Sequence, residues 1–329
     1  MSGKLRKLGY SLVPLVVIGA ASELGLRSSG WPQITETFEH NSPFWVTDPD
    51  LKGKSFPHKE EKRLFKVSSN ADGLRAAGQS QTKDGSVTRI LTLGCSTTFG
   101  WGVSDDETYP AQLARRFADA GLDDIEVVNG GQPGYTSFQG RWLWNETLQH
   151  YQPDVVLIGY VVQDARKAAY SDKSQAVLQG DSRFLKDNVL YKSRVYLAIR
   201  SVLGDFQVKA KERPQNGKGG VYRVPPADYV DNLRSLVGSA QTIGATPVLF
   251  GFPLERGGYT EEHRKILKAA SAELNIPLLD LQPRMERASR EEQLYFENDR
   301  GHANAAGNSK IADWVYAYLV EEKIVDVEQ

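Results

Sequence analysis

Two candidate nucleophiles stand side by side in the segment "RILTLGCSTTFGWG", residues 89–102. Cys95 and Ser96 follow an apolar run that predicts a buried strand, and a glycine-containing turn comes after them. A serine at this point can cap the next helix, or it can attack an electrophile where the helix start favours developing negative charge. Adjacent residues at a strand end point to opposite faces, so if Ser96 faces a cleft, the Cys95 thiol faces the core.

A base for such a nucleophile occurs late in the chain, in "DRGH" at 299–302. This spacing lets Asp299 and His302 project from one turn, so that the carboxylate can hold one ring nitrogen while the other faces a nucleophile. The alternative is that Asp299 caps a turn and His302 is an ordinary surface residue.

Hydrogen-bond donors come from two further loops, "NGGQPGYTS" at 129–137 and "VVQDAR" at 161–166. In the first loop, Gly131 and Gly134 stand where a backbone N–H can approach a substrate closely. The alternative for both segments is an ordinary connection between a strand and a helix.

The elements that must position these residues alternate regularly. Strands are predicted at 87–94, 124–130, 154–162, 246–252 and 276–281, and helices at 107–121, 136–151, 225–244, 260–274 and from about 304 onwards. Such alternation predicts a five-stranded parallel sheet covered by helices on both faces. Ligands of such sheets bind at the carboxyl ends of the strands, which is where all the candidate residues fall.

Composition excludes several classes of function. The formal net charge is −1 and no basic stripe is present, which argues against a nucleic-acid partner. One cysteine allows neither an intrachain disulfide nor a cysteine-based metal cluster, and no pair of the five histidines has the spacing of zinc ligands. We therefore expect no metal and no cofactor.

The first residues indicate export. Lys4, Arg6 and Lys7 precede a run that is apolar from Leu8 to Ala21, whereas a spanning helix needs roughly 17 to 25 residues. We expect residues 1–27 to form a hydrophobic helix that anchors the chain in the inner membrane, with the main domain in the periplasm or outside the cell. The alternative is a signal peptide cleaved near 20–22, which would make the protein secreted.

Three further regions follow this segment. Residues 28–87 are rich in Pro, Gly, Ser and charge, which predicts an irregular extension that packs on the core. Residues 88–325 are expected to form the main domain. It contains a charged excursion at about 165–224, which includes "KAKERPQNGKGG".

Taken together, the motifs resemble those of the SGNH (or GDSL) hydrolase superfamily over roughly residues 88–320. "LGCSTTFGWG" is similar to its first block, "NGGQPGYTS" to its second and "DRGHANAAGNSKIADWV" to its last. The segment "NADGLR", at 70–75, also resembles one that precedes the core in membrane-anchored members. The resemblance implies a flavodoxin-like three-layer α/β/α fold and ester hydrolysis, with Ser96, His302 and Asp299 as the catalytic triad.

The same resemblance assigns the oxyanion hole to Ser96, Gly134 and Gln163. Two positions depart from the pattern of the family: Cys95 stands where it has an aspartate outside the triad, and Gln163 stands where it has an asparagine. Glutamine keeps the amide donor but moves it by about one bond length. A lost oxyanion donor typically costs about 100- to 1000-fold in turnover.

These observations predict a serine esterase that removes O-acyl or acetyl groups outside the cytoplasm, with acylated carbohydrate or another ester as its substrate. Transfer of the acyl group to a sugar hydroxyl in place of water stays open. The alternative from a different class is a weak or inactive member that acts as a membrane-tethered scaffold or glycan-binding subunit. In either case, protein partners in a membrane complex are an open alternative.

Overall fold

The computed structural model of the chain describes residues 2–29, 44–75, 78–168, 170–180, 193–199 and 220–326. Parts of the predicted N-terminal extension (30–43, 76 and 77) and much of the predicted excursion (181–192 and 200–219) lie outside these residues. The chain divides into two compact units. One comprises Met1–Pro43 with Ser174–Gly220, and the other comprises Phe44–Lys173 with Val221–Gln329.

The first unit contains the helix α1, Ser2–Ser29. Glu23, the residue that interrupts the apolar run, accepts hydrogen bonds from the backbone N–H groups of Arg194 and Val195 at 2.9 and 3.0 Å. A carboxylate at this position satisfies N–H groups at the start of the helical residues 194–199, which have no partner within their own helix. Among helices whose side chains are described, none is both long enough and apolar enough to cross a membrane.

The second unit is built on a five-stranded sheet with the order β4-β3-β5-β8-β9. Its strands are β3 (Thr88–Gly94), β4 (Ile125–Gly131), β5 (Val155–Gly159), β8 (Thr246–Gly251) and β9 (Leu278–Asp280), and all neighbours pair in parallel. β3 lies between β4 and β5, with Gly94 opposite both Gly131 and Gly159. The three segments that carry the candidate residues therefore leave the sheet next to one another.

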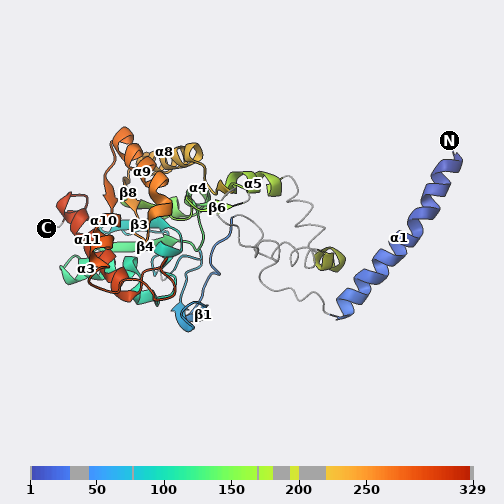
Figure 1. Cartoon of the computed structure of the whole chain (residues 1–329), viewed down its shortest axis with the longest axis horizontal. Coiled ribbons are helices and arrows are strands. Elements are labelled where there is room, and N and C mark those ends of the chain that lie inside the picture. Colours follow the sequence, from blue (N-terminus) through green and yellow to red (C-terminus); the bar gives the residue numbers. More distant parts are fainter. Residues whose placement is uncertain are drawn as a thin grey trace. The chain divides into compact units, whose positions relative to one another are not determined.

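Helices cover both faces of this sheet (Figure 1). One apolar layer includes Leu143, Leu236 and Leu267, from α4 (Ser137–Glu146), α8 (Pro226–Thr242) and α9 (Glu261–Leu274). The opposite layer packs α3 (Tyr109–Asp119), α10 (Gln282–Ala288) and α11 (Ala305–Glu321). The predicted three-layer α/β/α fold is confirmed, because apolar side chains that alternate across each strand need a cover on both faces.

Short elements complete this unit. An antiparallel hairpin pairs β1 (Lys54–His58) with β2 (Arg63–Val67) within the predicted N-terminal extension. The ends of the predicted excursion meet, because β6 (Lys167–Ala168) pairs antiparallel with β7 (Val221–Tyr222). The remaining elements are α2 (Ser96–Phe99), α5 (Asp172–Gly180) and the 3₁₀ turns η2 (Asp105–Glu107), η3 (Leu148–Tyr151) and η5 (Gly258–Thr260).

Candidate active site

Three candidate side chains form one hydrogen-bonded row at the carboxyl edge of the sheet. The Ser96 Oγ lies 2.8 Å from His302 Nε2, and His302 Nδ1 lies 2.6 Å from the Oδ2 atom of Asp299. Ser96 comes directly after β3, whereas Asp299 and His302 belong to the loop that leads into α11. The tertiary structure thus joins residues that are 206 positions apart in the sequence.

The loop of Asp299 is itself held by hydrogen bonds. The Gly301 N–H donates to Asp299 Oδ1 at 3.1 Å, and the Asn304 side chain caps α11 by accepting from the Gly307 N–H at 3.0 Å. Burial raises the pKa of the Asp299 carboxyl, but the hydrogen bond and charge of His302 together with the Gly301 N–H lower it more, so that the pKa lies below its usual value. Asp299 is therefore an anion at neutral pH, and it can orient the imidazole and stabilise its charged form.

Cys95 points away from this row. Its side chain is 1% exposed and lies in an apolar cluster with Val161, Val162 and Leu254. The prediction that the Cys95 thiol faces the core is confirmed, while the neighbouring Ser96, which is 7% exposed, contacts His302.

The turn that carries Ser96 is held by Arg75, the last residue of "NADGLR". The Arg75 guanidinium is fully buried and donates to the carbonyl oxygens of Phe99 and Gly100 at 2.8 and 2.6 Å. It also forms an ion pair with Asp105 at 3.0 Å. Because the last carbonyls of a helix have no partner within it, this guanidinium fixes the backbone that follows the nucleophile position.

His58, which the sequence analysis did not single out, lies behind Asp299. Its ring is fully buried, it packs against Phe296 with ring centroids 4.8 Å apart, and its Nε2 is 3.2 Å from Asp299 Oδ2. The His58 Nδ1 accepts from the Glu61 N–H, so the proton of the neutral ring is on Nε2, although that N–H is not aligned for a hydrogen bond to the carboxylate. A histidine in an irregular polar extension carries no local signal of this contact.

His58, Glu60 and Asp299 also form the one group of acidic and histidine side chains in the described residues that could hold a metal ion, with ligand atoms within 4.8 Å of one another. However, His58 Nδ1 is engaged with the backbone and Asp299 Oδ2 with His302. These contacts indicate that His58 helps to hold Asp299 in place, rather than that the three side chains bind a metal ion.

The two other residues of the expected oxyanion hole lie in loops at the same edge. Gly134 has φ +76°, a left-handed conformation that glycine adopts without steric cost. Its carbonyl oxygen accepts from Arg223 at 2.8 Å, and the Oε1 atom of Gln163 accepts from the same guanidinium nitrogen at 3.1 Å. The sequence analysis did not single out Arg223. It directly follows the short strand β7, and no motif there indicates that a basic residue binds these two loops.

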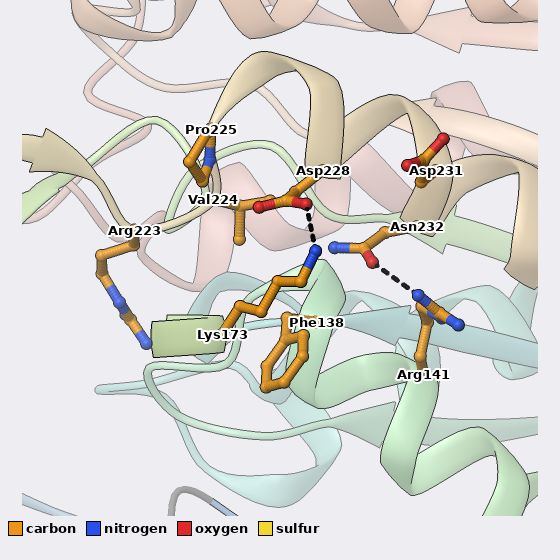
Figure 2. Close-up of a pocket in the computed structure, with 9 residues that line it drawn as sticks. All are labelled: Phe138, Arg141, Lys173, Arg223, Val224, Pro225, Asp228, Asp231 and Asn232. Atoms are coloured by element: carbon orange, nitrogen blue, oxygen red, sulfur yellow. Dashed lines mark hydrogen bonds and ion pairs between the residues drawn. The ribbon is translucent and has the colours of Figure 1, made fainter. Parts of the chain in front are cut away.

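A small pocket of about 90 Å³ lies beside Arg223 (Figure 2). Lys173 reaches across it to Asp228 at 2.8 Å, and Arg141 donates to Asn232 at 3.0 Å. These side chains pair with one another, and Figure 2 shows the Lys173 side chain directed away from Arg223. The pocket thus lies where side chains of α4 and α8 meet Lys173.

Comparison with known proteins agrees with the motifs. A model of the GDSL-like lipase/acylhydrolase family matches residues 92–310. Solved structures that resemble this chain include TesA, with 20% identity, a TM-score of 0.48, and coverage of 71% of this chain and 99% of that one. A lipase/acylhydrolase from Enterococcus faecalis has 15% identity, a TM-score of 0.49, and coverage of 74% and 100%.

A third solved structure is a catalytic mutant of Axe2, an acetylxylan esterase from Geobacillus stearothermophilus, with 18% identity, a TM-score of 0.49, and coverage of 75% of this chain and 99% of that one. No curated protein matches the sequence. The family match covers well over half of the chain and includes Ser96, Gly134, Gln163, Asp299 and His302. The chain therefore belongs to the GDSL-like lipase/acylhydrolase family, and with it to the ester hydrolases.

Proposed function

We propose that the protein is a serine O-acyl esterase in which Ser96 is the nucleophile, His302 the general base and Asp299 the residue that orients the histidine. The observation that carries this proposal is the row Ser96–His302–Asp299, with contacts of 2.8 and 2.6 Å. Both distances lie within the range needed for proton transfer and for orientation of the base.

The reaction follows from these contacts. Ser96 Oγ attacks the ester carbonyl while His302 Nε2 takes the hydroxyl proton, which forms a tetrahedral intermediate. The intermediate collapses, the C–O bond to the alcohol breaks, and His302 returns the proton to the departing oxygen. Water then attacks the acyl-enzyme with His302 again as base, which releases the carboxylic acid and restores Ser96.

The negative charge of the intermediate falls on the former carbonyl oxygen. Its proposed donors are the backbone N–H groups of Ser96 and Gly134 and the side-chain amide of Gln163. Ser96 is the first residue of α2, where backbone N–H groups lack helical partners. Donors fixed in place before the reaction stabilise this charge without any cost of rearrangement.

The proposed substrate is an acylated carbohydrate outside the cytoplasm. Support comes from the basic residues Lys4, Arg6 and Lys7 ahead of the apolar N-terminal run, which are typical of an export signal or anchor. A location outside the cytoplasm would bring O-acyl groups of envelope or extracellular polysaccharide within reach of the site, with a lipid ester as the alternative substrate. The location and substrate can be tested by fractionation with N-terminal sequencing of the mature chain, and by turnover of acetylated oligosaccharides.

The catalytic proposal is tested by Ser96→Ala. Turnover of p-nitrophenyl acetate should fall by at least about 1000-fold, because the nucleophile is lost while the fold is retained. A fluorophosphonate probe should label the wild-type protein at Ser96 and leave the variant unlabelled. Cys95→Ser is the matched control and should keep most of the activity. If Ser96→Ala keeps its turnover, or if the folded wild-type protein resists the probe, the esterase proposal is wrong.

A further inference from the structure

We propose that Arg223 is a positioning residue that holds both Gln163 and Gly134 in the geometry of the oxyanion hole. The inference rests on the proposed function and adds to it a residue that no motif contains. Arg223 lies at the end of the excursion, and its guanidinium binds both the loop of Gly134 and the loop of Gln163, which are expected to supply oxyanion donors.

Arg223 sets the direction of the Gln163 amide. The Gln163 Oε1 atom accepts from Arg223 at 3.1 Å. The oxygen and nitrogen of a planar amide point to different sides, so this contact turns the Nε2 donor away from Arg223. Within the described part of the chain, Nε2 has no hydrogen-bond partner of its own and is available to a ligand. Gln163 has one more rotatable bond than the asparagine of the family pattern, and Arg223 removes that freedom.

Arg223 also binds the loop of Gly134. The same guanidinium nitrogen that binds Gln163 also donates to the Gly134 carbonyl oxygen at 2.8 Å. The neighbouring nitrogen donates to Gln139 Oε1 at 3.1 Å, and that atom also accepts from the Thr136 N–H at the start of α4. Arg223 therefore fixes the spacing between the loop after β4 and the loop after β5.

Arg223 is itself held rigidly by Asp172. The two side chains form a bidentate ion pair, with contacts of 3.0 and 2.8 Å, and Asp172 is only 5% exposed. The Thr136 hydroxyl donates to the same carboxylate at 2.8 Å. Bidentate pairing fixes the plane of the guanidinium as well as its charge, so lysine cannot replace arginine here.

The neighbouring pair Lys173–Asp228 provides a matched control. It also joins α5 to α8 across the pocket beside Arg223, and the Lys173 side chain points away from Arg223 (Figure 2). A role of Arg223 limited to holding α5 in place would be shared by Lys173, whereas a role in orienting Gln163 would not.

The test is a double-mutant cycle of Arg223→Met and Gln163→Ala, with Lys173→Met as the control and Ser96→Ala as the inactive baseline. The measured quantities are kcat, KM and the rate of fluorophosphonate labelling. Each single variant should lower kcat about 100-fold with little change in KM, because the oxyanion exists only in the transition state. The double variant should lose clearly less than the product of the two single losses, since Arg223 acts in part through that amide. Any loss beyond that of Gln163→Ala alone reports the contact of Arg223 with Gly134. Lys173→Met should match the wild type.

Three results would overturn the proposal: unchanged kcat in Arg223→Met, additive losses in the double variant, or an equal loss in Lys173→Met. If Arg223→Met does not fold, Arg223→Lys keeps the charge and should still lose at least about tenfold in kcat. If the wild type neither turns over esters nor reacts with the probe, the esterase proposal has failed independently. Crystal structures of the wild type and Arg223→Met then decide the positioning role, and an unmoved Gln163 amide contradicts it.

Discussion

Two arginines support the two sides of the candidate active site, and they do so in different ways. Arg75 is fully buried and donates to four backbone carbonyls, those of Lys66, Phe99, Gly100 and Val103. The side chain of Arg223 is 20% exposed, and among its partners are the side-chain oxygens of Gln139, Gln163 and Asp172.

From this difference we infer that Arg75 mainly stabilises the fold, whereas Arg223 mainly positions groups of the candidate active site. Carbonyl groups in a buried turn must be paired wherever the turn exists, so the partners of Arg75 belong to the fold itself. A glutamine side chain can rotate away and the chain remains folded, so the partners of Arg223 belong to the geometry of the site. We therefore expect the loss of Arg75 to reduce the amount of folded protein and the loss of Arg223 to reduce the rate per folded molecule.

The largest expected effect on stability comes from Arg75→Met. The substitution leaves Asp105 without its cation and several buried carbonyls without a donor, which should cost about 3 to 5 kcal/mol in the free energy of unfolding. Urea unfolding followed by tryptophan fluorescence measures this loss. Arg223→Met leaves Asp172 without its cation and should also lose stability, but less, because only one backbone carbonyl, that of Gly134, loses its donor. A loss under about 1 kcal/mol for Arg75→Met would remove the contrast between the two arginines.

The second effect concerns a titrating carboxyl in the Arg223 region. Asp164 follows Gln163, is fully buried, and accepts from the Ser137 N–H at 2.9 Å, while its other oxygen has no partner in the described structure. Burial raises the pKa of the Asp164 carboxyl from 3.8 to about 6, against the opposing hydrogen bonds from Ser137.

The sign of the pH dependence follows from this raised pKa. The folded state binds the proton more tightly than the unfolded state, so the stabilisation is complete below about pH 4 and is lost as the pH rises through about 6. Asp164→Asn removes this dependence and keeps an acceptor for Ser137, so at pH 7 it should be more stable than the wild type by about 3 kcal/mol. If the free energy of unfolding is measured from pH 4 to 8, the difference between Asp164→Asn and the wild type should increase as the pH rises. If this difference instead decreases as the pH rises, the folded protein favours the ionised carboxylate of Asp164, contrary to the prediction.

The smallest expected effect belongs to Lys173→Met. The Lys173 side chain is 63% exposed, and its ion pair with Asp228 is screened by solvent. Exposed pairs contribute little to stability, so the melting temperature should change by no more than about 3 °C. A larger loss would show that the ion pair beside Arg223 has a structural importance comparable to that of Arg75, which is contrary to the proposed contrast.

Much of the fold could be predicted because its signals are local. The runs that became β3, β4 and β5 are apolar and bounded by glycines, and Thr108 and Asn304 cap α3 and α11 with side-chain oxygens. β5 ends at Gly159 rather than at the predicted residue 162, because its pairing with β3 ends where Gly94 meets Gly159. The contacts of His58 and Arg223 could not be predicted, since neither residue lies in a periodic segment or a motif.

The sequence by itself determined the parallel sheet, the position of Ser96 at the end of a strand, and the spacing of Asp299 and His302 within one turn. Each of these depends on residues that are neighbours in the chain, for which backbone geometry and side-chain direction suffice. Only the tertiary structure decided which arginine holds each loop, and that a histidine of the extension lies behind Asp299. Arg223 is 60 residues from Gln163 and 89 from Gly134, and His58 is far from Asp299 in the sequence. Such long-range contacts depend on how separate segments pack together, and no local pattern encodes that packing.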